Sequence, residues 1–197
     1  MVLIADQTHA GIRLPIQHLT DDAFFAFCQN NPDFKFERDA DGTIITMALT
    51  GGTTGKRNTD LTIELGLWNR TSRAGIVFDS STGFRLPNGA NRSPDVSFVS
   101  YERWNALSPD QQTKYPPLCP DFMVELMSEN DHLRDATDKM QEYLENGCQL
   151  AWLINPKTEE TRIYRSDGSV QVIHGFDNTL PGDAVLPGFQ LDLSLLR

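Results

Sequence analysis

The chain has 197 residues, a length that suits one domain with a hydrophobic core of its own. It carries 27 acidic against 17 basic residues, and this net charge of −10 argues against a protein that coats nucleic acid with a broad basic face. Local contact with phosphates, through metal ions and a few arginines, stays open. The apolar runs are only as long as strands, so no segment is expected to span a membrane.

Two further features concern the cell compartment. The first 19 residues lack both a basic leader and a long apolar stretch, so no secretion signal is expected. Three cysteines, Cys28, Cys119 and Cys148, lie far apart, and their odd number matches neither a disulfide framework nor a zinc site. A reducing, cytoplasmic location is therefore expected.

Residues 19–31 (LTDDAFFAFCQNN) predict a short helix. Thr20 is a favourable N-cap, and the acidic residues that follow it suit the positive end of a helix. Residues 34–49 (FKFERDADGTIITMAL) predict a β-hairpin, because its first arm alternates and the pair Asp41-Gly42 is typical of a tight turn.

Residues 51–75 begin as a loop of Gly and Thr and continue as a helix with one apolar face. The start invites comparison with a phosphate-binding loop. However, Gly51 and Gly55 have only three residues between them, and Arg57 stands where that motif has Ser or Thr. We therefore expect a loop that enters a helix, and no nucleotide site.

Strands and one further helix account for most of the remaining chain. We expect strands in 75–86, 93–100 and 121–128, a Pro-rich connection in 108–120, a helix in 131–147, two strands in 148–165 with a turn at Pro156 and Lys157, and a short extended piece in 186–197. This order predicts an α/β (α+β) fold with a mixed β-sheet flanked by helices. We assign residues 1–197 to a single domain, with the N-terminal helix and hairpin at about 18–49 and the core at about 50–197.

One carboxylate, Glu125, stands among five apolar residues in FMVELM. An ionised carboxylate in such surroundings is unfavourable unless it is paired or binds a metal. In SPDVSFV, Asp95 begins another alternating strand. If the two strands are neighbours, the two acids can meet, and a divalent ion such as Mg²⁺ would relieve their repulsion. Asp95 could equally be only a strand-start residue, and Glu125 could face solvent.

Lys139 flanks the apolar stripe of the helix predicted at 131–147, with Ala136 and Tyr143 as its neighbours on the same face. Its ammonium could reach the strand ends, where it would orient a water or stabilise negative charge. The alternative is a solvated helix lysine whose stem covers the core.

Four segments in this order, SPDVSFV, PDFMVELMS, DATDKMQEYLENGCQLAWLINP and LPGFQLDL, resemble the restriction-endonuclease family often called Uma-two. That family is placed in the PD-(D/E)xK nuclease superfamily. The helix LTDDAFFAF and the hairpin FERDADGTIITM extend the resemblance to nearly the whole chain. Each motif taken alone has low specificity, whereas the order and spacing of the motifs are specific. The resemblance implies a restriction-endonuclease-like core and a metal-dependent endonuclease that hydrolyses phosphodiester bonds in DNA.

By this resemblance, Asp95 is the acid of the PD pair and Glu125 the acid of (D/E)xK. They would hold Mg²⁺ or Mn²⁺ together with the main-chain carbonyl of Leu126. Lys139 would position the attacking water or neutralise charge on the phosphate. Glu37 matches an acid of the family's first hairpin and completes the implied catalytic set.

Two positions depart from the expected pattern. Met127 stands where the superfamily motif has lysine; the family shares this departure, and Lys139, followed four residues later by Tyr143, fits the displaced lysine. Asn58 stands where we expect histidine at the start of a helix. If that histidine matters, activity in this chain is reduced.

The alternative function is a catalytically inactive nuclease-fold protein that acts as a binding or interaction module. The acidic charge, Met127 and Asn58 support it, and a fold does not guarantee activity. A serine hydrolase is disfavoured because Ser128 has no histidine visibly tied to it, His132 included.

A nuclease of this kind would have DNA as its substrate, and a homodimer is expected because the two strands of a duplex are related by a two-fold axis. The Pro-rich stretch KYPPLCP (114–120) could lie at the dimer interface or in a surface loop. The predicted phosphate contacts, or alternatively scattered solvated charges, are Lys56, Arg57, Arg70, Arg73, Arg85 and Arg92.

Overall fold

The computed structural model describes residues 12–14 and 19–197, and for residues 12–14 it describes the backbone only. Most of the segment in which no secretion signal is expected lies outside these residues. No helix in the described ranges is long and apolar enough to cross a membrane.

The predicted N-terminal helix and hairpin are confirmed. Helix α1 (Asp21–Gln29) begins after Thr20, whose hydroxyl accepts a hydrogen bond from the Ala23 N–H at 3.2 Å. Strand β2 (Lys35–Arg38) pairs antiparallel with β3 (Ile44–Met47). Gly42, at φ 92°, supplies the left-handed residue that the connecting turn requires.

Three more short strands extend this hairpin into a five-stranded sheet in the order β1-β3-β2-β6-β5. They are β1 (Ile12–Leu14), β5 (Phe84–Arg85) and β6 (Asn91–Arg92). Only the pair Arg38 and Asn91 joins β2 to β6. This link places the end of β2 beside the segment that leads into the larger sheet.

The larger sheet has six strands in the order β11-β10-β9-β8-β7-β4. Its neighbours pair antiparallel, except that β8 and β9 are parallel. A parallel pair needs a crossover connection, and helix α5 (Leu133–Glu145) supplies it. The strands are β4 (Gly75–Asp79), β7 (Val96–Ser100), β8 (Phe122–Leu126), β9 (Leu150–Asn155), β10 (Glu160–Arg165) and β11 (Val170–His174).

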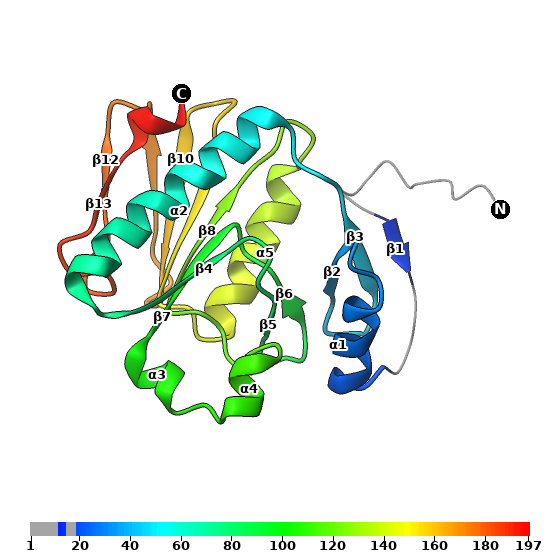
Figure 1. Cartoon of the computed structure of the whole chain (residues 1–197). Helices are drawn as coiled ribbons and strands as arrows, with labels where there is room; N and C mark the ends of the chain where they lie inside the picture. The colour runs from blue at the N-terminus through cyan, green and yellow to red at the C-terminus, as the bar shows by residue number, and fades with distance from the viewer. Residues whose placement is uncertain (1–11, 15–18) are drawn as a thin grey trace.

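Helices cover both faces of this sheet, with α2 (Gly52–Ser72) in front and α5 behind it (Figure 1). Helices α3 (Tyr101–Asn105) and α4 (Pro109–Thr113) connect β7 to β8. Strands β12 (Thr179–Pro181) and β13 (Gln190–Asp192) pair near the C-terminus, and the 3₁₀ turn η1 (Leu193–Leu196) follows. The mixed sheet flanked by helices is thus confirmed.

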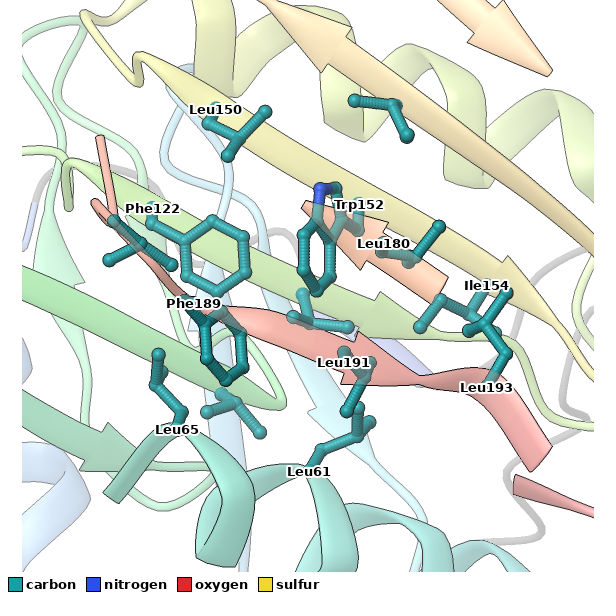
Figure 2. Close-up of a cluster of buried hydrophobic side chains, with 14 of the residues drawn as sticks. Leu61, Leu65, Phe122, Leu150, Trp152, Ile154, Leu180, Phe189, Leu191 and Leu193 are labelled. Carbon is teal, nitrogen blue, oxygen red and sulfur yellow. The ribbon is translucent and has the colours of Figure 1, made fainter. Parts of the chain in front are cut away.

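An apolar cluster fills the space between α2 and the sheet (Figure 2). Trp152 of β9 is fully buried; its ring meets the Phe122 ring edge-on, with centroids 4.8 Å apart, and stacks on Phe189 at 6.0 Å. Leu61 and Leu65 close the cluster from α2. Each such side chain stabilises the fold by about 1.5–3 kcal/mol when it is fully buried, so this cluster fixes α2 on its face of the sheet.

A second cluster packs the opposite face against α5. Met123 of β8 is buried there together with Met140 and Tyr143 of the helix. Side chains alternate along a strand, so Glu125 lies on the same face as Met123 and Met127. The Glu125 carboxylate therefore faces α5.

Residues 75–86 do not form the single strand that the sequence predicts. β4 ends at Asp79, whose Oδ1 accepts hydrogen bonds from Ser81 and from the Thr82 hydroxyl. Such side chains offer the backbone an alternative to the ladder of a sheet. The chain turns here, and β5 joins the other sheet.

The Pro-rich stretch 114–120 is not the exposed surface loop that was one of its two predicted roles; its other predicted role, at a dimer interface, stays a prediction. Pro116, Leu118, Cys119 and Pro120 are buried. Leu118 and Cys119 belong to the cluster beneath α5. The buried residues of the stretch therefore contribute to the core, whereas Lys114, Tyr115 and Pro117 are partly exposed.

Candidate active site

Asp95 lies directly before β7, at the point where this strand pairs with β8 through Val96 and Val124. Its Oδ2 accepts a hydrogen bond at 2.8 Å from the Leu126 N–H, the peptide that joins Glu125 to Leu126. The predicted meeting of the two strand ends is therefore observed. Asp95 is tied to the backbone that carries Glu125.

Glu125 sits in β8, with apolar strand residues on either side of it. Its Oε1 accepts a hydrogen bond from the Tyr143 hydroxyl at 2.7 Å and lies 3.0 Å from the Lys139 Nζ. Its side chain is 16% exposed. No described residue donates to Oε2. The carboxylate thus has partners from α5 and keeps one oxygen available.

Lys139 reaches the strand end as its helical position predicts. Its Nζ lies 3.0 Å from Glu125 Oε1 and 3.0 Å from Glu37 Oε1. Burial alone would lower the pKa of this ammonium, but the two carboxylates raise it above its usual value of 10.5. Lys139 is therefore a charged group held between two acids.

Glu37, in strand β2 of the N-terminal hairpin, is only 3% exposed. Its Oε1 accepts a hydrogen bond from the Ser93 N–H at 2.9 Å as well as from Lys139. Burial acts to raise the pKa of Glu37, but the positive charges of Lys139 and Arg92 act in the opposite direction and outweigh it, so the net shift is downward. Glu37 is thus an ionised partner of the site lysine.

Asn58, the residue that stands where histidine is expected, contacts the site directly. Its Nδ2 donates a hydrogen bond to Asp95 Oδ1 at 3.0 Å. Its own Oδ1 is buried without a hydrogen-bonding partner among the described residues. The amide therefore orients Asp95 from α2 in this chain.

A pocket of about 490 Å³ opens over these residues. Glu37, Glu125, Leu126 and Lys139 line it, whereas Asp95 does not and reaches the site through the Leu126 N–H. The pocket is strongly acidic, since its lining also includes Asp39, Asp131, Asp135, Asp138 and Glu142.

The oxygen donors of Asp95, Glu125 and Leu126 fit a hard divalent cation. Burial raises the pKa of Asp95, and burial together with the negative charges of Asp95 and Glu37 raises that of Glu125. A bound cation would offset this repulsion. The described residues contain no group of three or more His, Cys, Asp or Glu side chains arranged for a metal. The other ligands would thus be the Leu126 carbonyl, water and substrate.

Most of the basic residues predicted to contact phosphate instead bind carboxylates or carbonyls of this protein. Arg92 is 8% exposed and paired with acids, so the prediction is wrong for this residue. Arg85 pairs with Asp21. Of the six, only Arg70 and Arg73 are exposed without a side-chain partner in the part of the chain that the structure describes.

A hydrolase centred on serine gains no support. His132 lines the pocket, but no hydrogen bond joins it to Ser128 within the described residues. The Ser128 N–H instead binds the Asp131 carboxylate at 2.7 Å. The nucleophile and base of such a site are therefore not assembled.

Comparison with known proteins assigns the chain to a family. Residues 21–194 match the Uma2 model, described as "Putative restriction endonuclease". No curated protein matches the sequence significantly. Among solved structures, the chain is similar to one described as "a putative nuclease belonging to DUF820" from Anabaena variabilis, with a TM-score of 0.75 and 19% identity over 91% of this chain and 97% of that one. The chain thus belongs to the Uma2 family of restriction-endonuclease-like proteins.

Proposed function

We propose that this chain is a metal-dependent endonuclease that hydrolyses phosphodiester bonds in DNA. The observation that carries the proposal is the placement of the Lys139 ammonium, 3.0 Å from Glu125 in a pocket whose neighbouring strand end holds Asp95. The family and the fold support a nuclease. We also propose that the enzyme forms a two-fold dimer, because a dimer could act on both strands of a duplex. Light scattering would detect this dimer.

Asp95 and Glu125, with the main-chain carbonyl of Leu126, would hold Mg²⁺ or Mn²⁺. When bound, such an ion lowers the pKa of an attacking water and stabilises negative charge on the phosphate. The chain's own groups keep these ligands in place: the Leu126 N–H orients Asp95, and the Tyr143 hydroxyl orients Glu125. Such fixed orientation is what a site needs for efficient chemistry.

Lys139 would take the role that the superfamily motif gives to the residue two positions after the acid. That residue, Met127, is buried in the core and carries no charge. Lys139 reaches the same acid from α5. Its ammonium would donate hydrogen bonds to the attacking water or to a phosphate oxygen and so stabilise the developing negative charge.

The acidic pocket favours the second candidate, an inactive nuclease-fold protein that binds another molecule. Seven acids line the pocket, and both of its cationic residues, Arg92 and Lys139, are already paired with carboxylates. A polyanion meets repulsion there unless divalent ions accompany it. Metal binding therefore discriminates between the two functions.

The first test is calorimetric titration of Mg²⁺ and Mn²⁺ into wild type, Asp95→Asn and Glu125→Gln. We expect binding in the wild type that disappears in both variants, because each removes one anionic ligand. Glu102→Gln is the control, since this exposed residue of α3 does not line the pocket, and it should bind like the wild type.

Cleavage of duplex DNA completes the test. Lys139→Met should retain metal binding and lose cleavage by about 100-fold or more, because it removes transition-state stabilisation and leaves the metal ligands intact. If the wild-type protein binds no metal, even with DNA present, the result would contradict the nuclease proposal and favour the interaction protein.

A further inference from the structure

Arg92 lies between the N-terminal hairpin and α5, and its guanidinium meets three carboxylates. Nε lies 2.6 Å from Glu142 Oε2, Nη2 lies 2.8 Å from Asp39 Oδ1, and Nη1 lies 3.6 Å from Glu37 Oε2. The residue is only 8% exposed. A planar guanidinium spreads five donors over a rigid fork and can contact carboxylates on different sides of it, whereas a lysine ammonium is a single compact charge.

These contacts join the three chain segments that carry the proposed site. Asp39 follows β2, which carries Glu37. Glu142 lies on α5, three residues after Lys139 and next to Tyr143, so its ion pair fixes the helical turn that carries both groups. Arg92 itself ends β6, three residues before Asp95.

Arg92 also influences which carboxylate the Lys139 ammonium contacts. Glu37 Oε1 accepts hydrogen bonds from the Lys139 ammonium and from the Ser93 N–H, while the Arg92 guanidinium lies near Oε2. Because Arg92 balances much of the Glu37 charge, Lys139 is shared equally with Glu125, at 3.0 Å from each. Without Arg92, Glu37 would be left with Lys139 as its nearest cation and would draw the ammonium away from Glu125.

We infer that Arg92 is a positioning residue that keeps Lys139 at Glu125. It does so by neutralising Glu37 and by anchoring the α5 turn through Glu142. The effect on catalysis rests on the nuclease function proposed above, whereas the effect on geometry does not.

Crystal structures of metal-free variants test the geometry. Arg92→Lys keeps the charge but cannot reach three carboxylates, so Lys139 should move onto Glu37 and out of hydrogen-bonding range of Glu125. In the double variant Arg92→Lys/Glu37→Gln the competing charge is gone, and Lys139 should return to Glu125. Arg162→Lys is the control, because Arg162 pairs with Glu160 at 2.7 Å outside the pocket.

Kinetics test the consequence. Arg92→Lys should lower kcat of metal-dependent cleavage by about 10- to 100-fold, the usual effect of losing a group that orients a site residue. KM and Mg²⁺ affinity should change by less than about 3-fold, since no ligand is removed. The double variant should recover much of the lost kcat. If Arg92 had only a structural role, the loss of kcat in the double variant would instead be the sum of the losses caused by Arg92→Lys and by Glu37→Gln.

The outcomes separate the two proposals. Lys139 still within hydrogen-bonding distance of both acids in Arg92→Lys overturns the inference, whatever the activity. A wild-type protein without cleavage overturns the nuclease function, and the metal-free structures still decide the role of Arg92. If Arg92→Lys does not fold, Glu142→Gln serves instead: it removes only the helix partner, and an unmoved Lys139 would again overturn the inference.

Discussion

The Tyr143 hydroxyl is fully buried and donates its hydrogen bond to a carboxylate, at 2.7 Å from Glu125 Oε1. A hydrogen bond to a charged group is stronger than one between neutral groups. Burial and the nearby charges of Glu125 and Glu37 raise the pKa of Tyr143, so the phenol remains a donor throughout the ordinary pH range. Tyr143 therefore stabilises the ionised form of Glu125.

Tyr143→Phe should lower the free energy of unfolding by about 1.5–3 kcal/mol, because it leaves a partly buried carboxylate short of one donor. Urea unfolding of the metal-free protein would measure the change. Tyr164→Phe is a matched control: that hydroxyl lies near Arg162 but is buried without a hydrogen bond of normal geometry to a described residue. Its loss should change stability little; equal losses in both variants would contradict the assigned role of Tyr143.

Several site contacts could be predicted at the scale of single residues, and others could not. Helical spacing alone placed Lys139 beside Tyr143 on the face toward the strand ends. The contact of Lys139 with Glu37 joins residues 102 positions apart, and only the resemblance indicated Glu37 at all. Arg92 was misjudged because a basic residue in a loop-rich segment gives no sign that its charge will be buried among acids.

At the scale of elements, periodicity located the helices and most strands but could not assign the strands to sheets. β4 and β5 are close in sequence yet belong to different sheets, and a single residue pair links β2 to β6. No pattern within either segment encodes that pairing. Similarly, the burial of Leu118 and Cys119 depends on α5, which lies later in the chain.

Helix α1 is held to the five-stranded sheet by Asp21, which forms ion pairs with Arg38 of β2 and Arg85 of β5. Burial acts to raise the pKa of Asp21, but hydrogen bonds from both arginines lower it below 3.8. Since the pKa is lower in the folded protein than in the unfolded chain, this stabilisation is present above about pH 4 and is lost as the pH falls through the folded value.

Asp21→Asn should therefore reduce the free energy of unfolding near neutral pH and have a shrinking effect below about pH 4. The effect should stay below about 1 kcal/mol, because solvent screens this half-exposed carboxylate. Urea unfolding between neutral pH and pH 3 would measure it. Asp33→Asn, at an exposed position without an ion pair to a described residue, is the control and should be neutral at every pH. A constant difference down to pH 3 would show that the ion pairs are not its cause.

For the molecule as a whole, charge limits how nucleic acid can bind. The net charge is −10, and the pocket adds a local concentration of acids. Lys56 and Arg57 donate hydrogen bonds to the carbonyls of Leu195 and Leu196, so they fasten the C-terminal turn to α2. Few cations of the described residues are thus left to replace counterions on DNA.

DNA binding should consequently require divalent ions and depend only weakly on monovalent salt. Each neutralised phosphate contributes about 0.9 to the slope of log K against log salt, and with so few unpaired cations we expect a slope of no more than about 3. Fluorescence anisotropy with Lys139→Met, which should bind without cleaving, would measure it at constant millimolar Mg²⁺. The same titration with Asp95→Asn should show little binding at any salt concentration. A slope of about 8, or strong binding without divalent ions, would mean that a basic face steers DNA to this protein, and the site would then not depend on a metal to receive it.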